Sequence, residues 1–202
     1  PSFFDCTGIE PCFENDGYIL YLGRLDKDKG VINLIKAYEI GKFETPLYIV
    51  GGSSGDGEYE RLKEYVQDKH IENIIFHGFK KSHDLIPLIQ RAMFTVVPSI
   101  WLDNSPMSVL EAMACGKPVI GSDLGGISEQ VSSETGILVE PNSPEALTDA
   151  IAKMLSYGDR LSVIGKKCRE MVETVNSVDR HYTSLMSIFR SLCTQTLQQH
   201  KD

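Results

Sequence analysis

Short runs of apolar residues alternate with amphipathic segments of helix length along most of this chain. The apolar runs are rich in Ile, Val, Leu and Tyr and occupy residues 18–23, 46–52, 74–78, 93–99, 118–122 and 136–141. Because they show no polar alternation, they are typical of strands buried on both faces, as in a parallel sheet. Helical spacing occupies residues 31–40, 59–70, 82–92, 105–115, 144–157, 159–174 and 178–198. The alternation predicts an α/β fold with a doubly wound, parallel sheet of six strands.

The composition is ordinary for a globular protein. The chain has 202 residues, 42% apolar and 24% charged, which fits one domain, alone or with an appendage. Its net charge of −8 opposes nonspecific attraction to nucleic acid and to anionic lipid, so we expect no nucleic-acid partner. No apolar run approaches the roughly 20 residues needed to span a bilayer, and the first residues show no secretory signal pattern. Residues 1–15 read as a linker, and we expect the chain to be a piece of a longer protein.

The five cysteines, Cys6, Cys12, Cys115, Cys168 and Cys193, are scattered along the chain. No CxxC pair or His/Cys cluster has the spacing of a zinc site. Reduced thiols in a cytoplasmic protein are therefore the first expectation. A disulfide between Cys6 and Cys12 is the alternative.

Ligands of doubly wound sheets bind beyond the carboxyl ends of the strands, which directs attention to WLDNSPMSVLEAMACGKPVI at residues 101–120. Ser105 or Asn104 is a good helix N-cap, and Pro106 suits the first helical position. Gly116 fits the left-handed residue beyond the C-terminus. These signals predict a helix over 106–115 whose start faces the end of the fourth strand. Its free N–H groups form a candidate phosphate cradle at Met107, Ser108 and Val109.

Two carboxylates flank this predicted helix start. Glu111 lies about one and a half turns into the helix, where its carboxylate can accept two hydrogen bonds from a vicinal diol such as a ribose. Asp103, in the preceding loop, can reach a group beyond the phosphates. The alternative is that Asp103 caps the helix and Glu111 is a solvated helix position. Local chemistry alone leaves the two interpretations equal.

The first strand-to-helix turn, GRLDKDKG at residues 23–30, lacks the GxGxxG dinucleotide fingerprint, and the chain has no P-loop pattern. The turn offers Arg24 and Lys29, whose cations can stabilise charge on a departing diphosphate without a metal. The alternative is that they form surface pairs with Asp26 and Asp28, which is favoured when this turn is taken alone. No Ser/His/Asp grouping indicates a hydrolase.

Six segments, taken together and in order, resemble the retaining glycosyltransferases of family 4, which have the GT-B fold. They are residues 23–30, YIVGG at 48–52, FHGF at 76–79, 101–120, SDLGGISE at 122–129 and GILVEP at 136–141. The resemblance covers roughly residues 15–198 and falls on the C-terminal, donor-binding half of those enzymes. It implies a Rossmann-like nucleotide-sugar-binding domain over 16–176 after the linker. It also implies that 177–202 is a C-terminal helix crossing back onto an N-terminal domain.

The family's Glu-x7-Glu signature matches Asp103 and Glu111. The resemblance implies that Glu111 binds the ribose hydroxyls of a nucleotide-sugar, and that Asp103, shorter than Glu by one methylene, faces the donor sugar. Arg24 and Lys29 look like the pair that grips the diphosphate, and with Asp103 they are the implied catalytic residues. The other implied donor-binding positions are Gly23, Gly78, Phe79, Lys80, Asn104, Met107, Ser108 and Val109.

The implied reaction transfers a sugar from a nucleotide-diphosphate sugar to an acceptor hydroxyl with retention, using no metal and no other cofactor. The implied pathway is cell-surface polysaccharide or glycolipid synthesis. The second implied partner is an N-terminal acceptor-binding domain of the same enzyme, without which we expect little transfer. We expect a cytoplasmic protein or one peripheral at the inner membrane face, with any membrane contact through that other domain. The alternatives are a non-catalytic nucleotide-sugar-binding module and a GT-B relative with different chemistry, such as sugar-nucleotide epimerisation.

Overall fold

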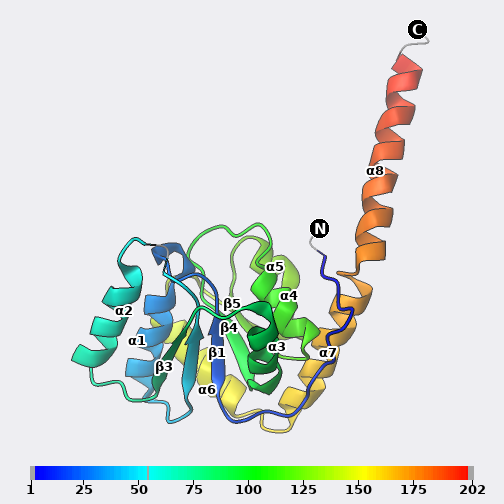
Figure 1. Cartoon of the computed structure of the whole chain (residues 1–202). Helices are drawn as coiled ribbons and strands as arrows, with labels where there is room; N and C mark the ends of the chain where they lie inside the picture. Colours follow the sequence, from blue (N-terminus) through cyan, green and yellow to red (C-terminus); the bar gives the residue numbers. More distant parts are fainter. Residues whose placement is uncertain (1–2, 54, 200–202) are drawn as a thin grey trace.

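The computed structural model describes residues 3–53 and 55–199, and its strands form one parallel sheet of six (Figure 1). The strands are β1 (Ile19–Leu22), β2 (Leu47–Val50), β3 (Ile74–Gly78), β4 (Phe94–Val97), β5 (Val119–Ser122) and β6 (Gly136–Val139). Their order across the sheet is β3-β2-β1-β4-β5-β6. The predicted doubly wound α/β fold is confirmed, because every apolar run of the sequence contains one of these strands.

Every helix that the sequence predicts is present, with ends shifted by a few residues. These helices are α1 (Val31–Gly41), α2 (Glu58–Asp68), α3 (Ser82–Arg91), α4 (Met107–Ala114), α6 (Pro144–Leu155), α7 (Arg160–Thr174) and α8 (Val178–Gln199). Two short elements have no counterpart in the sequence prediction: the 3-10 helix η1 (Lys27–Lys29) and the helix α5 (Gly126–Gln130). Both lie in loops that leave the carboxyl ends of strands.

Each face of the sheet is covered by helices (Figure 1). On one face, Ile19 and Ile49 belong to a core cluster with buried residues of α1, α2 and α6. On the other face, Leu20 and Val50 belong to a cluster with buried residues of α3, α4, α5 and α7. Because both faces are dry, the strands need apolar residues at successive positions, which explains their continuous apolar runs.

The helix predicted over 106–115 begins one residue later than expected. Pro106 lies at the N-cap of α4 with an extended backbone (φ −66°, ψ 116°), and no side chain caps the helix. The prediction that Ser105 or Asn104 is the N-cap is therefore wrong. The hydroxyl of Ser105 is engaged elsewhere, since it accepts a hydrogen bond from Nε2 of Gln130 at 3.1 Å. At the other end, Gly116 has the left-handed conformation that the sequence predicts (φ 75°).

The cysteines whose side chains the structure describes, Cys6, Cys12, Cys115 and Cys168, are free thiols. The alternative of a Cys6–Cys12 disulfide is therefore wrong. The side chain of Cys193 lies outside the described part. Among the helices of residues 3–53 and 55–199, none combines the length and the hydropathy needed to span a bilayer.

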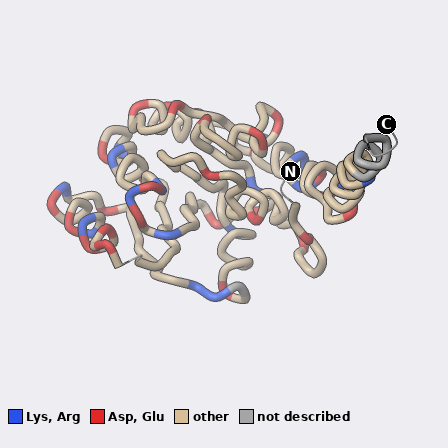
Figure 2. Tube along the Cα trace, turned by 90° about the horizontal axis from the view of Figure 1, so that it is seen from above, with Lys and Arg blue, Asp and Glu red and all other residues tan. Residues whose placement is uncertain are grey.

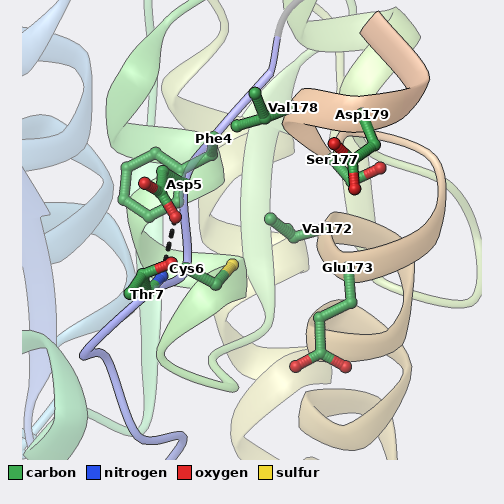
Figure 3. A pocket seen from close by; sticks show the side chains of 9 residues that line it. All are labelled: Phe4, Asp5, Cys6, Thr7, Val172, Glu173, Ser177, Val178 and Asp179. Atoms are coloured by element: carbon green, nitrogen blue, oxygen red, sulfur yellow. Dashed lines mark hydrogen bonds between the residues drawn. The ribbon is translucent and has the colours of Figure 1, made fainter. Parts of the chain in front are cut away.

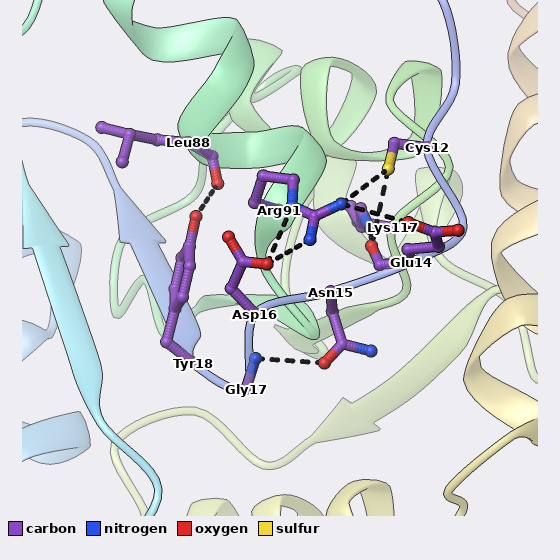
Figure 4. A network of polar contacts seen from close by, with 9 residues as sticks. All are labelled: Cys12, Glu14, Asn15, Asp16, Gly17, Tyr18, Leu88, Arg91 and Lys117. Carbon is purple, nitrogen blue, oxygen red and sulfur yellow. Dashed lines mark hydrogen bonds and ion pairs between the residues drawn. The ribbon is translucent and has the colours of Figure 1, made fainter.

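The N-terminal residues run against the domain before β1. The N–H of Phe4 donates to the carbonyl of Asn176 at 2.9 Å, and that of Cys12 donates to the carbonyl of Cys115 at 3.0 Å. Further along, Arg91 and Lys117 fasten residues 14–16 to the domain (Figure 4). At the other end of the chain, α8 projects away from the sheet and its covering helices (Figure 1).

Candidate functional site

The candidate site lies where β1 and β4 are neighbours in the middle of the sheet. The connections from these two strands leave toward opposite faces at this point, which opens a crevice at the carboxyl ends of the strands. A pocket of about 360 Å³ occupies this crevice. Its lining contains seven of the site residues that the sequence predicts: Gly23, Arg24, Lys29, Asp103, Met107, Ser108 and Glu111.

The Lys29 side chain is held by the local structure of η1. The Asp26 side chain caps this 3-10 helix and accepts a hydrogen bond from the N–H of Lys29. The ammonium Nζ of Lys29 lies 2.7 and 2.8 Å from the two carboxylate oxygens of Asp103. These two side chains are only 20% and 18% exposed. The alternative of a surface pair with Asp26 or Asp28 is therefore wrong for Lys29, whose partner is Asp103 on the loop after β4.

Two contacts tie η1 to the loop that carries Asp103. The N–H of Ile100 and the hydroxyl of Ser99 both donate to the carbonyl of Asp28, at 2.9 and 3.1 Å. Ser99 is 1% exposed, so its hydroxyl makes this contact from a buried position. These hydrogen bonds connect the loops after β1 and β4, and the Lys29–Asp103 pair links the same two loops.

Arg24 differs from Lys29 in its exposure. Its side chain is 72% exposed, and it forms an ion pair of 3.3 Å with Asp26. The alternative of a surface pair therefore describes Arg24 in this structure. Its backbone is nevertheless fixed, because the buried Tyr21 donates its phenolic O–H to the Arg24 carbonyl at 2.7 Å. Arg24 therefore lines the pocket with a fixed backbone and an exposed side chain.

The start of α4 supplies backbone donors to the pocket. The N–H of Val109 donates to the carbonyl of Pro106 at 3.2 Å, and the Val109 side chain is fully buried. Within the described residues, the N–H groups of Met107 and Ser108 have no acceptor. The predicted phosphate cradle is thus narrower than three residues, with Met107 and Ser108 offering the free donors.

Glu111 also lines the pocket, on the wall formed by α4. Partial burial raises the pKa of the Glu111 carboxyl above its ordinary value, and no cation contributes to this shift. A carboxyl whose pKa is raised by burial in a crevice is common in binding sites. The alternative of a solvated helix position does not describe this residue.

Five predicted residues lie outside the pocket lining: Val109, described above, and Gly78, Phe79, Lys80 and Asn104. Gly78 ends β3, and Phe79 and Lys80 follow it, with Phe79 74% exposed. Asn104 lines a second hollow of about 630 Å³, together with Phe3, Phe4, Met107, Glu129 and His181 among others. Met107 forms part of the wall of both hollows.

A third hollow, of about 400 Å³, lies between the N-terminal segment and the junction of α7 and α8 (Figure 3). Its lining includes Phe4, Asp5 and Cys6 on one side and Val172 and Val178 on the other. None of the predicted site residues lines it.

The sequence prediction missed Tyr21 and Ser99, since no motif marks either residue and their roles depend on the register of neighbouring strands.

Charged side chains are mixed over the molecule when it is viewed from above (Figure 2). Basic positions are spread over several places among the more numerous acidic ones and do not gather into one basic face. Any anionic ligand therefore depends on local cations and helix ends such as those of this pocket. Within the described residues, no group of three or more His, Cys, Asp or Glu side chains could hold a metal ion.

A doubly wound domain with this crevice has the architecture of a GT-B glycosyltransferase half. The sequence matches the family Glycosyl transferases group 1 over residues 8–173, so the chain belongs to that family. An uncharacterized glycosyltransferase of Methanocaldococcus jannaschii is 30% identical over 169 residues, which make up 79% of this chain and 41% of that protein. The chain therefore spans less than half the length of this relative.

Solved structures have the same fold. Sucrose-phosphate synthase from Thermosynechococcus elongatus superposes with a TM-score of 0.83 at 28% identity, over 96% of this chain and 52% of that one. Anabaena HepE in complex with UDP-glucose gives 0.77 at 22% identity, over 88% and 49%. The C-terminal domain of a group 1 glycosyl transferase from Francisella tularensis gives 0.77 at 22% identity, over 87% of this chain and 99% of that one. The predicted identity as the C-terminal domain of a GT-B glycosyltransferase is confirmed.

Proposed function

We propose that this chain is the donor-binding part of a retaining glycosyltransferase that moves a sugar from a nucleotide-diphosphate sugar to an acceptor hydroxyl. The observation that carries the proposal is the pocket between β1 and β4, where two cations, two carboxylates and a helix start meet. A nucleotide-sugar has the matching groups in order: ribose hydroxyls, a diphosphate and a sugar. The Anabaena HepE structure contains UDP-glucose, and the same ligand class suits this pocket.

The diphosphate is assigned to Lys29, Arg24 and the start of α4. An ammonium has three N–H donors, and the Lys29 contacts with Asp103 leave one for a phosphate oxygen. The free N–H groups of Met107 and Ser108 and the positive end of the α4 dipole favour an anion at the same place. Arg24 can swing from Asp26 onto the diphosphate, since its side chain is largely exposed. Together these groups stabilise the departing nucleoside diphosphate without a metal.

The ribose is assigned to Glu111. Its carboxylate has two acceptor oxygens for a vicinal diol, and hydrogen bonds to a charged acceptor contribute about 1.5–3 kcal/mol each. The hydroxyls would also replace the hydration that Glu111 loses through burial. The loop of Gly78, Phe79 and Lys80 is assigned to the base of the nucleotide-sugar. Gly23, Asn104 and Asp103 are also assigned as donor-binding residues, with Asp103 nearest the transferred sugar.

The acceptor site is assigned to an N-terminal domain of the same enzyme. The chain spans 41% of its Methanocaldococcus jannaschii relative, which leaves room for a domain of similar size. Helix α8 supports this partner, because apolar side chains spaced by three and four residues are exposed along it. They include Tyr182, Leu185 and Phe189, which are 62%, 39% and 52% exposed.

We assign the enzyme to cell-surface polysaccharide or glycolipid synthesis in the cytoplasm.

The donor assignment is tested by titrating the chain with UDP-, GDP- and ADP-sugars while following thermal unfolding. A ligand present at 100 times its Kd should stabilise the fold by about 2.7 kcal/mol. Glu111→Ala should weaken binding of the stabilising donor by at least about tenfold, because it removes two charge-assisted hydrogen bonds. Glu64→Ala, at an exposed position of α2, is the matched control and should bind like the wild type. Full donor affinity in Glu111→Ala would refute the ribose assignment.

Transfer is tested separately from binding. Without an acceptor-binding domain, we expect the chain to bind the donor and to release little free sugar or glycosylated product. A non-catalytic nucleotide-sugar-binding module is the second candidate, because every residue assigned above is assigned to the donor and none to the acceptor. Fusing the chain to the N-terminal half of a relative and measuring transfer distinguishes the two, since a binding module stays inactive in the fusion.

A further inference from the structure

Helix α5, which the sequence does not predict, contacts the loop that carries Asp103. The N–H of Gly126 donates to the carbonyl of Asp103 at 2.7 Å. Four residues further along the helix, Nε2 of Gln130 donates to the hydroxyl of Ser105 at 3.1 Å. The short loop between β4 and α4 is therefore fastened to α5 on both sides of Asn104.

The approach of α5 to this loop is too close for any side chain at its first residues. A Cβ atom on Gly126 would lie 2.0 Å from the carbonyl oxygen of Asn104. A Cβ atom on Gly125 would lie 2.8 Å from the carbonyl oxygen of Asp103. Gly125 also has φ 55° and ψ −137°, a conformation that only glycine adopts without strain. The Gly-Gly pair is thus required by the contact with the loop.

Helix α5 is itself fixed by the core. Ile127 is fully buried, and Gln130 and Val131 are 2% and 3% exposed. Ile127 and Val131 belong to the core cluster that also contains buried residues of α4 and α7. A helix of five residues is not stable by itself, so its position is dictated by this packing. The loop therefore contacts an element that is rigidly attached to the sheet.

We propose that Gly125, Gly126 and Gln130 are positioning residues of the donor site. They set the backbone of residues 103–105, so that the Asp103 carboxylate meets the ammonium of Lys29 and that ammonium faces the pocket. None of the three lines the pocket, so they act through Asp103 and not by touching the donor. The proposal rests on the donor-binding function proposed above, and it adds the elements that hold that site in shape.

The test compares four proteins: the wild type, Gln130→Ala, Gly126→Ala and the control Gly165→Ala. A Cβ atom on Gly165 would lie 2.1 Å from the Gly116 carbonyl oxygen, so this control introduces an equivalent backbone clash away from the pocket. The first readout is hydrogen–deuterium exchange of the peptide 101–108 without any ligand. The second is the Kd for the nucleotide-sugar that stabilises the wild type most among UDP-glucose, GDP-mannose and ADP-glucose. Both are measured well below the unfolding temperature of each variant.

We expect Gln130→Ala and Gly126→Ala to accelerate exchange in 101–108 and to weaken the donor about tenfold, the loss that follows from one net hydrogen bond. Gly165→Ala should lower thermal stability and leave both readouts at wild-type values. If Gly126→Ala does not fold, Gln130→Ala decides alone. The double variant Ser105→Ala/Gln130→Ala should lose no more affinity than Gln130→Ala, because both changes remove the same bond.

The proposal would be overturned by unchanged exchange in 101–108, or by faster exchange with unchanged donor affinity. Equal effects of Gly165→Ala on both readouts would also overturn it, since the losses would then follow from stability alone. A wild type that binds none of the nucleotide-sugars refutes the proposed function instead. In that case the exchange experiment still decides whether α5 holds the loop.

Discussion

Replacing Lys117 by Met should change the pH dependence of stability in a direction that the structure fixes. Lys117 is 2% exposed, and its ammonium donates to the carbonyl of Glu14 at 2.7 Å (Figure 4). Burial, which disfavours the charged form, lowers the pKa of Lys117 from 10.5 to about 8. The folded chain therefore releases this proton at a lower pH than the unfolded chain does.

The sign follows from linkage between protonation and folding. Between pH 8 and 10.5 the unfolded state binds more protons at this residue than the folded state, so stability rises with pH in that window. A pKa lowered from 10.5 to about 8 means that the charged form of Lys117 destabilises the folded chain by about 3 kcal/mol relative to the neutral form. This cost is present in full at pH 7, where Lys117 is charged in both the folded and the unfolded chain. Titrating from pH 7 to 9.5 removes about 2 kcal/mol of it. Lys117→Met has no proton to release and lacks this gain.

The assay is urea unfolding of both proteins at pH 7, 8, 9 and 9.5. The wild type should gain about 2 kcal/mol relative to Lys117→Met across the series, and titrating groups that the two proteins share cancel in the difference. Lys153→Met, at an exposed position on α6, is the control and should run parallel to the wild type. Parallel curves for Lys117→Met and the wild type would refute the argument that Lys117 carries a buried charge.

Three further predictions concern the pocket and the thiols. Lys29→Met should lower the free energy of unfolding by about 1–2 kcal/mol, because it leaves the mostly buried Asp103 without its cation. Urea unfolding measures this loss, and the double variant Lys29→Met/Asp103→Asn should regain part of it. Glu111→Gln should be more stable than the wild type at pH 7 and equal to it below pH 4. The reason is that the raised pKa of Glu111 makes the stability of the wild type fall as pH rises through its titration. Unfolding temperatures of the two proteins at the two pH values check this, and an advantage of Glu111→Gln that persists at pH 4 would contradict it. Cys115 and Cys168 are fully buried, and burial raises the pKa of each thiol to about 12. A thiol reagent should therefore label neither cysteine before the chain unfolds. Peptide mass spectrometry identifies the labelled sites, and rapid labelling of either cysteine in the native chain would contradict their burial.

The sheet could be predicted from the sequence because its strands are buried on both faces. A residue such as Ile49 must be apolar on one face and Val50 on the other, so each strand appears in the sequence as an uninterrupted run. Helix α5 gives no comparable signal. It has five residues, begins with glycine and buries only part of its surface, whereas helical periodicity becomes visible over 11–18 residues. Its position is set by tertiary packing, which a local pattern does not contain.

The partner of Lys29 could not be predicted for a related reason. Asp28 is adjacent in sequence and Asp103 is 74 residues away, so a local argument favours the neighbour. The order of strands reverses this preference, because β1 and β4 lie side by side and bring the loops after them together. The acid that matters for Lys29 is therefore decided by which strands are neighbours, a property of the whole sheet.

Arg24 and Lys29 have the same role in the sequence prediction, but the structure separates them by preorganisation. The Lys29 ammonium is already fixed, since both oxygens of Asp103 and the backbone of η1 determine its position. The Arg24 guanidinium is exposed and pairs with Asp26, so under the proposed function it would have to leave Asp26 and lose rotational freedom to hold a diphosphate. A fixed cation stabilises developing charge without reorganisation at the moment of reaction, whereas ordering an exposed side chain costs about 0.5–1.5 kcal/mol. In the proposed function, Lys29 would thus be the preorganised cation of the pocket, and Arg24 would engage only once an anion is bound.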